Sequence, residues 1–592
     1  MKDILLDKPG KKIILLGNEA IVRGALELGV EFVSTYPGTP ASEIGNTFFK
    51  LSQDKEYKEY FEFSVNEKTA LEAAIGASFS GLKTLVAMKN FGVNVCLDAL
   101  MPFVYTGTKG PTVIVVADDP SCHSSAQSEE NSRGFANLAH IPILEPADPQ
   151  ECKDFLKLAF QISEKFKIPI ILRTTTRVNH QRMPVQLGKI AQLNLVAGEF
   201  IKNPQQFVTL PPRVLEMKKE LLEKIEKIRA FAENSSVNLI DGGRTSINKK
   251  AGIITSGVSY LNVKEALKEL DLDLPILKLG FFYPLPEQKI KTFLRGLKKV
   301  LIVEELEPYL ENEVARLAKE ANCKLEVVGK KLLPEIGELK PEIIISAIAK
   351  FTNYKLKSMN FRSSPRFATA CVIGNWKSKI PQRSPQFCPG CSYWSVVSAI
   401  KKSVDPAKVI FGGDIGCYML FGTPAIGMQD YLSCMGSSIG IAHGIKKALR
   451  LGSGQADSQK LITFIGDSTF LHAGIPALIN TIFNKSNPLI IILDNQTTAM
   501  TGHQPNPAMA TKINSEYKFG FTDPDFSAKG DGCQPAIIIE DIVRACGVKN
   551  LKVIDPIKQE EFVSAIKEFL EKEEVSVIIA RRMCVLFAKS LK

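Results

Sequence analysis

The chain has 592 residues, of which 45% are hydrophobic and 23% are charged, and its formal net charge is +11. This composition is typical of a folded globular protein, and the length predicts about three or four domains. No apolar run approaches the ~20 residues that span a bilayer. The lysines are scattered, without basic runs that interleave with aromatic residues, so solubility explains the charge better than nucleic-acid binding does.

The N-terminal sequence MKDILLDKPGKK lacks the apolar core of a secretion signal, and we therefore expect a cytoplasmic protein. In such a chain the twelve cysteines are more typical of thiols or metal ligands than of disulfides. The positive net charge would also suit association with an acidic electron carrier.

Apolar runs alternate with helix-like stretches over the N-terminal part of the chain. The expected strands are residues 12–16, 31–35, 84–88, 112–118 and 168–173. The expected helices are residues 17–28, 66–80, 94–105, 130–138 and 149–165. This alternation is the signature of a doubly wound α/β domain, which we place at residues 1–185.

Two loops of this domain stand out. The first, Tyr36 to Glu43 (YPGTPASE), must be a loop because of its two prolines and its glycine, and Ser42 with Glu43 suits the start of a helix. The second, Asp118 to Arg133, is polar and unusually long for such a fold. Long loops at the carboxyl ends of strands are often functional, and disorder is the alternative interpretation.

The pattern lapses after residue 175, where TTTRVNHQRMPV reads as a loop and VLEMKKELLEKIEKIRAFAE as a charged connecting helix. We interpret residues 186–245 as a linker and residues 246–332 as a second α/β unit, with Phe281 to Pro286 forming a loop. This unit has no cofactor motif, which favours a structural or interface role. A second linker is expected at residues 333–380. The strands expected in the second unit include residues 251–256 and 299–303.

The third unit, residues 381–592, contains two strand ends that carry oxygen ligands. One apolar strand ends at Gly466-Asp467-Ser468, and the next, from Pro488, ends at Asp494-Asn495. In an open parallel sheet both ends emerge on the same, carboxyl edge, where ligands bind. Carboxylate, amide and carbonyl oxygens suit Mg²⁺. An ordinary βαβ unit with polar strand ends is the alternative.

This pair of strand ends resembles the diphosphate-Mg²⁺ motif of thiamine diphosphate (ThDP) enzymes, Gly-Asp-Gly followed after about 25 residues by Asn-Asn. Here 25 residues separate Ser468 from Asp494, with Ser in place of the third Gly and Asp in place of the first Asn. Further motifs run in order along nearly the whole chain: YPGTPASEI, SVNEKTALEAAIGASFSG, DDPSCHSS, FCPGCSYW, DIGCY, CMGSSIGIAHG and TTAMTGHQPNP. Together they resemble the α subunit of indolepyruvate:ferredoxin oxidoreductase, an arylpyruvate branch of the ThDP-dependent 2-oxoacid:ferredoxin oxidoreductases.

The resemblance implies a multi-domain α/β protein, with ThDP-binding doubly wound parallel sheets and a transketolase C-terminal-like domain. Residues 1–185 would bind the cofactor's pyrimidine, and residues 381–592 its diphosphate. The implied reaction is oxidative decarboxylation of an aryl 2-oxoacid, with one-electron transfer to ferredoxin and transfer of the acyl group to coenzyme A. The implied partner is a β subunit in a hetero-oligomer.

The resemblance assigns catalytic roles to residues of the first domain. Glu67 matches the carboxylate that hydrogen-bonds the aminopyrimidine, and its place in a first helical turn before an apolar helix predicts partial burial and a raised pKa. A capping Glu that suits the helix dipole is the alternative. Thr39 matches a substrate-contacting position, with turn chemistry as its alternative. Arg133 is a candidate clamp for the substrate carboxylate, or a solvent-exposed arginine.

In the third unit, Asp467 and Asn495 would hold Mg²⁺ together with the Thr497 main-chain carbonyl. Met500 stands where pyruvate-specific relatives have a polar Asn, and an adaptable Met favours a bulky aromatic substrate, with a core Met as the alternative. Further cofactor contacts are assigned to Gly466, Ser468, Met435 and Gly436.

Cys388, Cys391, Cys417 and Cys584 match the positions that ligate a [4Fe–4S] cluster in relatives, which need four thiolates. A redox CxxC or buried free thiols are the alternatives. The family's α subunit normally continues into a ferredoxin-like domain with two runs of closely spaced cysteines, and this chain contains no such run. We therefore expect those two clusters to be absent, so that electrons leave through the proximal cluster.

Two other functions compete with this interpretation. A non-oxidative ThDP-dependent decarboxylase would release an aldehyde and need no cluster. A non-catalytic assembly subunit would keep the fold, although the presence of Glu67, Asp467 and Asn495 argues against it.

Overall fold

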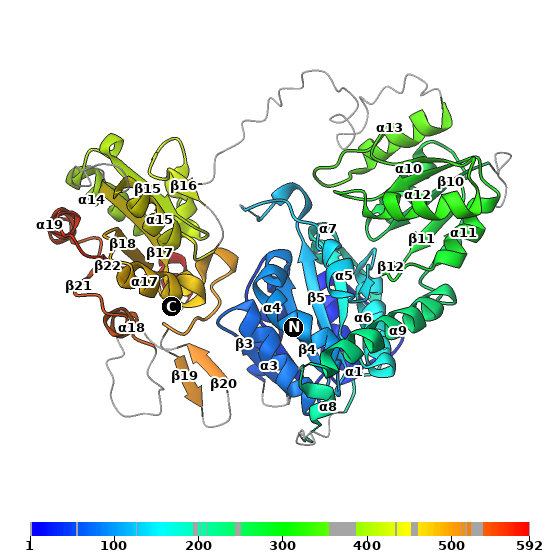
Figure 1. The fold of residues 1–592 in the computed structure, drawn as a ribbon, viewed down its shortest axis with the longest axis horizontal. Coiled ribbons are helices and arrows are strands. Elements are labelled where there is room, and N and C mark those ends of the chain that lie inside the picture. Colours follow the sequence, from blue (N-terminus) through cyan, green and yellow to red (C-terminus); the bar gives the residue numbers. More distant parts are fainter. Residues whose placement is uncertain are drawn as a thin grey trace. The chain divides into compact units, whose positions relative to one another are not determined.

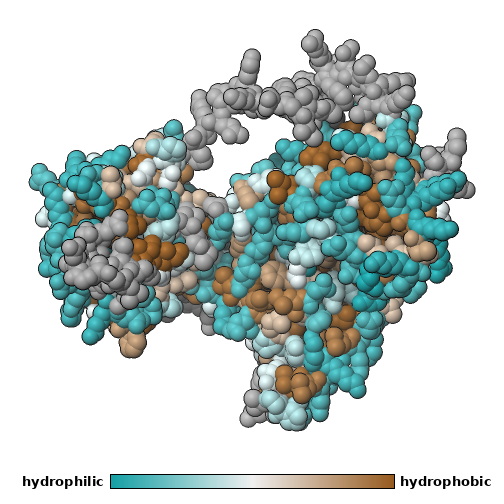
Figure 2. Space-filling view, turned by 45° about the horizontal axis from the view of Figure 1, so that its top comes forward, coloured by the Kyte–Doolittle hydropathy of each residue, from teal (hydrophilic) through white to brown (hydrophobic). Residues whose placement is uncertain are grey.

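The computed structural model describes residues 3–54, 57, 59–125, 127–192, 199, 201, 203–209, 211–242, 250–354, 386–432, 435–450, 460–509, 511–514, 518–521 and 537–590. The chain divides into two compact units, Met1–Ser378 and Lys379–Lys592, and each is described by itself (Figure 1). None of the helices in the described part of the chain has the length and apolar character that crossing a membrane requires. On the face shown in Figure 2, hydrophilic residues predominate and hydrophobic residues lie in separate areas between them.

The first unit contains a seven-stranded sheet in the order β12-β6-β7-β5-β4-β2-β3, parallel except for β12. The central strands β4 and β5 are almost completely buried, as continuous apolar runs covered by helices should be. The bounds are β2 Phe32–Thr35, β3 Tyr60–Phe63, β4 Thr84–Lys89, β5 Thr112–Asp118, β6 Ile143–Leu144, β7 Ile170–Thr175 and β12 Phe281–Tyr283.

Helices of this domain pack in pairs, α1 with α6 and α3 with α4, and contact the sheet (Figure 1). The doubly wound α/β arrangement expected for this domain is confirmed. The helices are α1 Gly17–Leu28, α2 Ser42–Ser52, α3 Glu67–Phe79, α4 Asn90–Thr106, α5 Gly134–Ala139 and α6 Pro149–Phe166, with a short 3-10 turn, η1, at Pro120–Cys122.

The strand expected at residues 12–16 forms as β1 (Lys12–Leu16), but it lies outside the main sheet. It pairs antiparallel with β8 (Arg182–Gln186), which follows α7 (Thr176–His180). The loop predicted for TTTRVNHQRMPV was therefore wrong. Because the two strands of this ladder are far apart in the sequence, a local pattern does not reveal their pairing.

The charged helix forms as α9 (Arg213–Glu233), after the single turn α8 (Pro204–Phe207). Its buried side chains recur every three or four residues, so one face packs against α4, α6 and α11 and the charged face stays outside. The buried residues are Met217, Leu221, Ile225, Ile228 and Ala232. The helix is thus part of the first unit's core.

The second sheet of the first unit has the order β14-β13-β10-β11-β9, with only β9 antiparallel in the described strands. Its strands are β9 Leu239–Asp241, β10 Ala251–Ser256, β11 Ile276–Leu279, β13 Lys299–Val303 and β14 Glu326–Val328. Its helices are α10 Ser259–Glu269, α11 Glu287–Arg295, α12 Tyr309–Ala321 and α13 Pro341–Thr352. Helix α13 packs on α10, although its residues were interpreted as the start of a linker.

One strand joins the domains of the two sheets. Phe281 to Tyr283, expected as part of a loop, forms β12 and pairs with β6 of the first sheet. The loop prediction was wrong here, because β12 is stabilised by a partner far earlier in the chain. A single buried cluster accordingly includes side chains from both domains, such as Ile143, Leu277 and Phe281. Residues 355–385, most of the second expected linker, lie outside the described residues.

The second unit is built on a six-stranded parallel sheet in the order β16-β15-β17-β18-β22-β21. Its strands are β15 Val409–Gly413, β16 Tyr431–Leu432, β17 Lys460–Gly466, β18 Leu489–Asp494, β21 Asn550–Ile554 and β22 Ser576–Arg581. A separate hairpin pairs β19 (Thr511–Asn514) with β20 (Lys518–Phe521).

Two hydrophobic clusters lie on the two faces of this sheet. One contains side chains of α14 and α19, and the other contains side chains of α15, α17 and α18. The helices are α14 Tyr393–Ser403, α15 Ser438–Arg450, α16 Asp467–Thr469, α17 Ile475–Phe483, α18 Ile539–Ala545, α19 Gln559–Leu570 and α20 Val585–Ser590. A π-helical turn, η4 (Phe470–Gly474), joins α16 to α17, and 3-10 turns lie at η2 Pro406–Lys408, η3 Cys417–Gly422 and η5 Ala499–Thr501.

Candidate active site

Glu67 begins helix α3, as the sequence predicts. The side chain of Asn66 caps this helix by accepting a hydrogen bond from the Thr69 N–H at 2.8 Å. The Glu67 side chain lies against Gly92 of α4, where an added Cβ would fall 2.6 Å from the Glu67 Cγ. Burial raises the pKa of Glu67 to about 7, although the charge of Lys89 opposes this. The expected raised pKa is confirmed, and with 7% of the residue exposed Glu67 is more deeply buried than the partial burial expected; its catalytic role stays a prediction.

The loop after β2 places Thr39 at the carboxyl edge of the sheet. The Thr39 hydroxyl lies 3.2 Å from the Ser42 hydroxyl at the start of α2. The Thr39 carbonyl accepts a hydrogen bond from Ser124 Oγ at 3.3 Å, and the next carbonyl, of Pro40, accepts one from Asn18 Nδ2 at 2.8 Å. Three elements therefore hold this loop in place.

The polar loop after β5 is organised by Asp119, whose carboxylate accepts four hydrogen bonds. The donors are the Ser124 N–H at 2.8 Å and hydroxyl at 3.1 Å, the Ser125 hydroxyl at 2.7 Å and the Thr176 hydroxyl at 2.6 Å. Ser121 and Cys122 both have positive φ, 68° and 49°. Two consecutive residues in this sparsely populated region are typical of functional loops.

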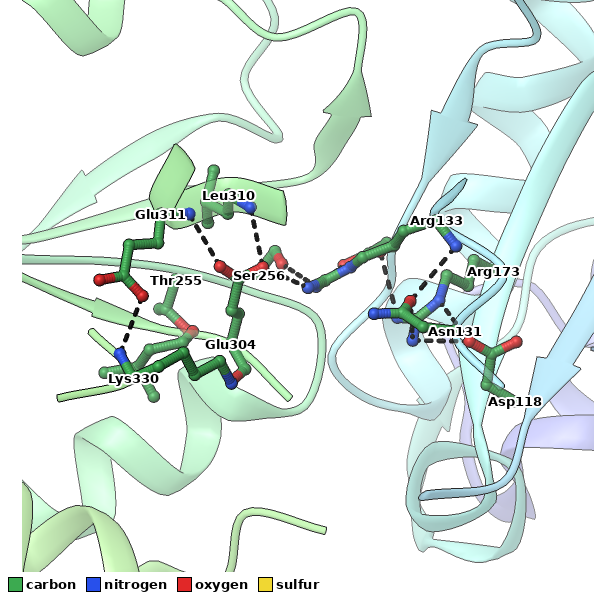
Figure 3. Close-up of polar contacts among 12 residues, drawn as sticks. Asp118, Asn131, Arg133, Arg173, Thr255, Ser256, Glu304, Leu310, Glu311 and Lys330 are labelled. Carbon is green, nitrogen blue, oxygen red and sulfur yellow. Dashed lines mark hydrogen bonds and ion pairs between the residues drawn. The ribbon is translucent and has the colours of Figure 1, made fainter. Parts of the chain in front are cut away.

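Four hydrogen bonds hold the Arg133 side chain inside the first unit (Figure 3). Its Nε and Nη2 donate to the two oxygens of Glu145 at 2.7 Å each, and its Nη1 donates to Glu304 at 2.9 Å. Nη2 also donates to the Ser256 hydroxyl at 2.6 Å. With 3% of the residue exposed, Arg133 is not the solvent-exposed arginine considered above. As a substrate clamp it would have to give up these contacts.

Electrostatics support a structural role for this network. Burial alone would raise the pKa of Glu145, but the charges of Arg133 and Arg173 hold it at about 2. Arg173 also pairs with Asp118 at 2.7 Å. Glu304 accepts the N–H groups of Leu310 and Glu311 at 2.9 and 2.8 Å, and so caps α12.

The two strand ends of the second unit meet as predicted. Gly466 at the end of β17 is in register with Leu493 of β18, so that Asp467 and Asn495 both follow the carboxyl edge. The Asp467 Oδ1 accepts from the Ser468 N–H at 2.8 Å and its Oδ2 from Asn506 Nδ2 at 3.2 Å. Asn495 Oδ1 accepts from the Thr497 N–H at 3.1 Å. All of these side chains are buried.

A divalent cation would suit the chemistry of this strand-end site. Burial raises the pKa of Asp467, and the nearby carboxylate of Asp494 raises it further. Asp494 is balanced by Arg581 at 2.6 Å, whereas the hydrogen-bond donors that the described residues supply to Asp467 are neutral. In the described part of the chain, no three Cys, His, Asp or Glu side chains converge as a metal site. Asn495 and a main-chain carbonyl could complete an oxygen set with Asp467.

The remaining predicted contacts surround this edge. Ser468 Oγ accepts from Thr498 Oγ1 at 3.2 Å. Gly436 has φ of 87°, and an added Cβ would fall 2.5 Å from the Cβ of Ala473, so that only glycine fits there. Met435 precedes it and is half-buried. Met500 lies on η5 and is 45% exposed, which excludes the alternative that it is a core methionine.

The four predicted cluster cysteines all lie in the second unit and influence one another electrostatically. Burial raises the pKa of the Cys417 thiol, and negative charge on Cys391, Cys584 and Cys388 raises it further. The four sulfurs therefore lie within electrostatic reach of one another. Among the residues that the structure describes, they are not drawn together at ligand distance. The donor set itself, four cysteines, is that of a [4Fe–4S] cluster.

Several residues at these sites were missed by sequence reasoning. Lys89 ends β4 beside Glu67, and Asp414 follows β15, where burial raises its pKa to about 7. Both are polar residues directly after apolar strands, the signal that identified Asp467. Tyr393, which accepts a hydrogen bond from Asn495 Nδ2 at 3.0 Å, and Asn506 offered no such signal because their partners are distant in sequence.

Three sequence families match parts of the chain. Residues 23–226 match "Pyruvate flavodoxin/ferredoxin oxidoreductase, thiamine diP-bdg", and residues 243–352 match "Indolepyruvate oxidoreductase domain". Residues 414–580 match "Thiamine pyrophosphate enzyme, C-terminal TPP binding domain". The two thiamine diphosphate families thus fall on the two sheets that carry Glu67 and Asp467.

Curated relatives match over essentially the whole chain. Indolepyruvate oxidoreductase subunit IorA of Methanothermobacter thermautotrophicus is 40% identical and covers 100% of this chain and 90% of the relative. The protein of the same name from Pyrococcus horikoshii is 42% identical and covers 99% and 87%. A solved 2-oxoglutarate:ferredoxin oxidoreductase from Magnetococcus marinus aligns at 17% identity with a TM-score of 0.47, over 57% of this chain and 65% of that chain.

The matched domains define the class, a thiamine diphosphate-dependent 2-oxoacid oxidoreductase. Within this class, the near-complete matches at about 40% identity show that the chain belongs to the IorA family of indolepyruvate oxidoreductase subunits.

Proposed function

We propose that the protein oxidatively decarboxylates an aryl 2-oxoacid of the indolepyruvate type. The acyl group passes to coenzyme A and the electrons pass to ferredoxin or a similar acceptor. The observation that carries this proposal is the match to relatives named indolepyruvate oxidoreductase subunit over 99–100% of the chain. Because those relatives are named as subunits, we further propose that the chain works with a β subunit.

Glu67 is proposed to activate the cofactor. Thiamine diphosphate, when bound, would supply the nucleophilic and electron-accepting chemistry that decarboxylation of a 2-oxoacid requires. A carboxyl group whose pKa lies near 7 can hold or release a proton at the aminopyrimidine nitrogen at neutral pH. The proposed pyrimidine-binding domain, residues 1–185, places this group at the start of α3. Thr39 is proposed to contact the substrate.

Asp467 and Asn495 are proposed to hold Mg²⁺ with the main-chain carbonyl of Thr497. The cation would neutralise the buried Asp467 and bind the cofactor's diphosphate. Gly466, Ser468, Met435 and Gly436 are proposed to line the diphosphate, in a domain that spans residues 381–592. The close packing of Gly436 on Ala473 would bring the backbone near the ligand.

One [4Fe–4S] cluster is proposed at Cys388, Cys391, Cys417 and Cys584. The support is the number and type of donors and their mutual electrostatic influence. Such a cluster would accept electrons one at a time and pass them to the external carrier.

The test is an anaerobic assay of the chain together with its β subunit, using arylpyruvates, coenzyme A and a viologen acceptor. We expect acyl-CoA formation coupled to viologen reduction. Glu67→Gln should lower kcat by about 10²- to 10⁴-fold, the usual range for losing a general acid–base group. Glu72→Gln, on the same helix and 51% exposed, is the matched control and should retain activity.

An aldehyde as the sole product, with no iron in the anaerobically purified protein, would identify a non-oxidative decarboxylase instead. Failure of thiamine diphosphate to bind with Mg²⁺ present would favour an assembly subunit without catalysis.

A further inference from the structure

Lys89 lies at the meeting point of the three segments that form the first unit's candidate site. It is the last residue of β4, which lies between β2 and β5 in the sheet. The loop after β2 contains Thr39, and the loop after β5 contains Ser124. The Gly38 backbone runs against it, since a Cβ added to Gly38 would fall 2.9 Å from the Lys89 Cβ. Lys89 is also within electrostatic reach of Glu67.

The ammonium group of Lys89 has hydrogen-bonding capacity to spare. Its Nζ donates to the Ser124 carbonyl at 3.3 Å and lies 4.9 Å from the centre of the Phe91 ring. An ammonium has three N–H donors, so one protein acceptor leaves two for a ligand. Among the residues that the structure describes, no carboxylate forms an ion pair with it.

The surrounding acidic groups do not neutralise Lys89 by contact. Among these acidic groups, Asp119 has the largest electrostatic effect on Lys89. Its carboxylate oxygens, however, accept hydrogen bonds from Ser124, Ser125 and Thr176. Glu67, Glu130 and the Cys122 thiol act on Lys89 only at longer range. The Lys89 ammonium is therefore a half-buried cation with N–H donors left for a ligand. The acidic side chains around it act on it without direct contact.

Every 2-oxoacid carries a carboxylate that must be bound beside the reacting carbonyl, and a cation is its natural partner. Arg133 is bound to Glu145, Glu304 and Ser256, and leaving them would break two buried ion pairs. Lys89 needs no such rearrangement, and it adjoins Thr39.

We propose that Lys89 is the residue that binds the carboxylate of the 2-oxoacid substrate, with its two remaining N–H donors. This assignment rests on the proposed function and adds to it the residue that distinguishes a 2-oxoacid from an uncharged carbonyl compound. Burial lowers the pKa of Lys89 to about 8, so the group is mostly charged at neutral pH, and a bound carboxylate would raise this pKa. The competing role is neutralisation of Glu67 without substrate contact.

The test uses the complete complex loaded with thiamine diphosphate and Mg²⁺, and compares two inert inhibitors. One is a 3-arylpropionate, which carries the carboxylate but no oxo group, and the other is its carboxamide. In the wild-type complex we expect the carboxylate to inhibit about 10- to 100-fold more tightly than the amide, the range for a charged hydrogen-bond pair.

In Lys89→Gln this ratio should fall close to one and KM for arylpyruvate should rise by a similar factor, while thiamine diphosphate still binds normally. Lys68→Gln is the matched control, because Lys68 lies beside Glu67 in sequence but is 39% exposed and pairs with Asp98 and Glu72. It should leave the ratio unchanged.

Two results would overturn the assignment. An unchanged inhibitor ratio in Lys89→Gln would show that another group binds the carboxylate. Loss of thiamine diphosphate binding or of kcat alone would show that Lys89 serves Glu67 and the cofactor. Neither result touches the proposed function, which instead fails if the wild-type complex does not oxidise arylpyruvates at all.

Discussion

Arg133, at the start of helix α5, donates to Glu304 at 2.9 Å, and Glu304 directly follows β13 of the second sheet in the first unit (Figure 3). The same guanidinium holds Glu145 through two hydrogen bonds of 2.7 Å. Since all three side chains are at most 3% exposed, their charges depend on one another rather than on water.

Removing this arginine should therefore destabilise the protein. We expect Arg133→Met to lower the free energy of unfolding by about 3–5 kcal/mol, the range for breaking a buried ion pair and leaving its partner charged. Chemical denaturation followed by circular dichroism measures this change. Arg316→Met is the control, because Arg316 is 47% exposed and pairs with Glu287 and Glu313, and it should cost at most about 1 kcal/mol. A stable Arg133→Met with a raised KM would instead restore Arg133 as the substrate clamp.

Glu67 gives a prediction about pH and stability in the cofactor-free protein. Burial raises its pKa from the ordinary 4.5 to about 7 in the folded state, so the folded state binds the proton more tightly. The contribution of Glu67 to the free energy of unfolding is therefore largest below pH ~4.5 and decreases as the pH rises through ~7. The total decrease is about 3 kcal/mol. Glu67→Gln removes this dependence, so the variant should gain stability over the wild type between these pH values. A constant difference across the range would contradict the raised pKa.

Asp467 gives a prediction about metal dependence. If it holds Mg²⁺, thiamine diphosphate and Mg²⁺ together should raise the melting temperature of the wild type by several degrees, since a ligand that binds only the folded state stabilises it. Excess chelator should abolish the shift, and Asp467→Asn should show little of it. Asp541→Asn, in the exposed first turn of α18, is the control. A full shift in Asp467→Asn would exclude Asp467 as a ligand.

Much of the candidate site could be predicted from the sequence because its signals are local. Glu67 lies in the first turn before an apolar helix, and Asp467 and Asn495 directly follow apolar strands. In a parallel sheet, such positions converge on the carboxyl edge whatever the rest of the chain does. Lys89 carries the same signal, at the end of the apolar run TLVAM, but was overlooked in the sequence.

The parts that failed depend on partners far away in the chain. Strand β12 forms because it pairs with β6, which lies more than a hundred residues earlier in the chain. Likewise β8 needs β1. The partners of Arg133, which are Glu145, Ser256 and Glu304, lie in three separate parts of the chain. No spacing in the sequence shows that the two glutamates share one arginine.

The cysteines give the last prediction. If Cys388, Cys391, Cys417 and Cys584 ligate one [4Fe–4S] cluster, anaerobically purified protein should contain about four iron atoms per chain and show broad absorbance in the near-ultraviolet and visible range. Cys417→Ser should lose most of the iron, because the half-buried Cys417 interacts electrostatically with the other three thiols. Cys323→Ser is the matched control, since Cys323 is exposed in the other unit, and it should retain the iron. Equal iron in both variants would show that the cluster, if bound, uses other ligands, and wild-type protein without iron would leave the four cysteines as thiols.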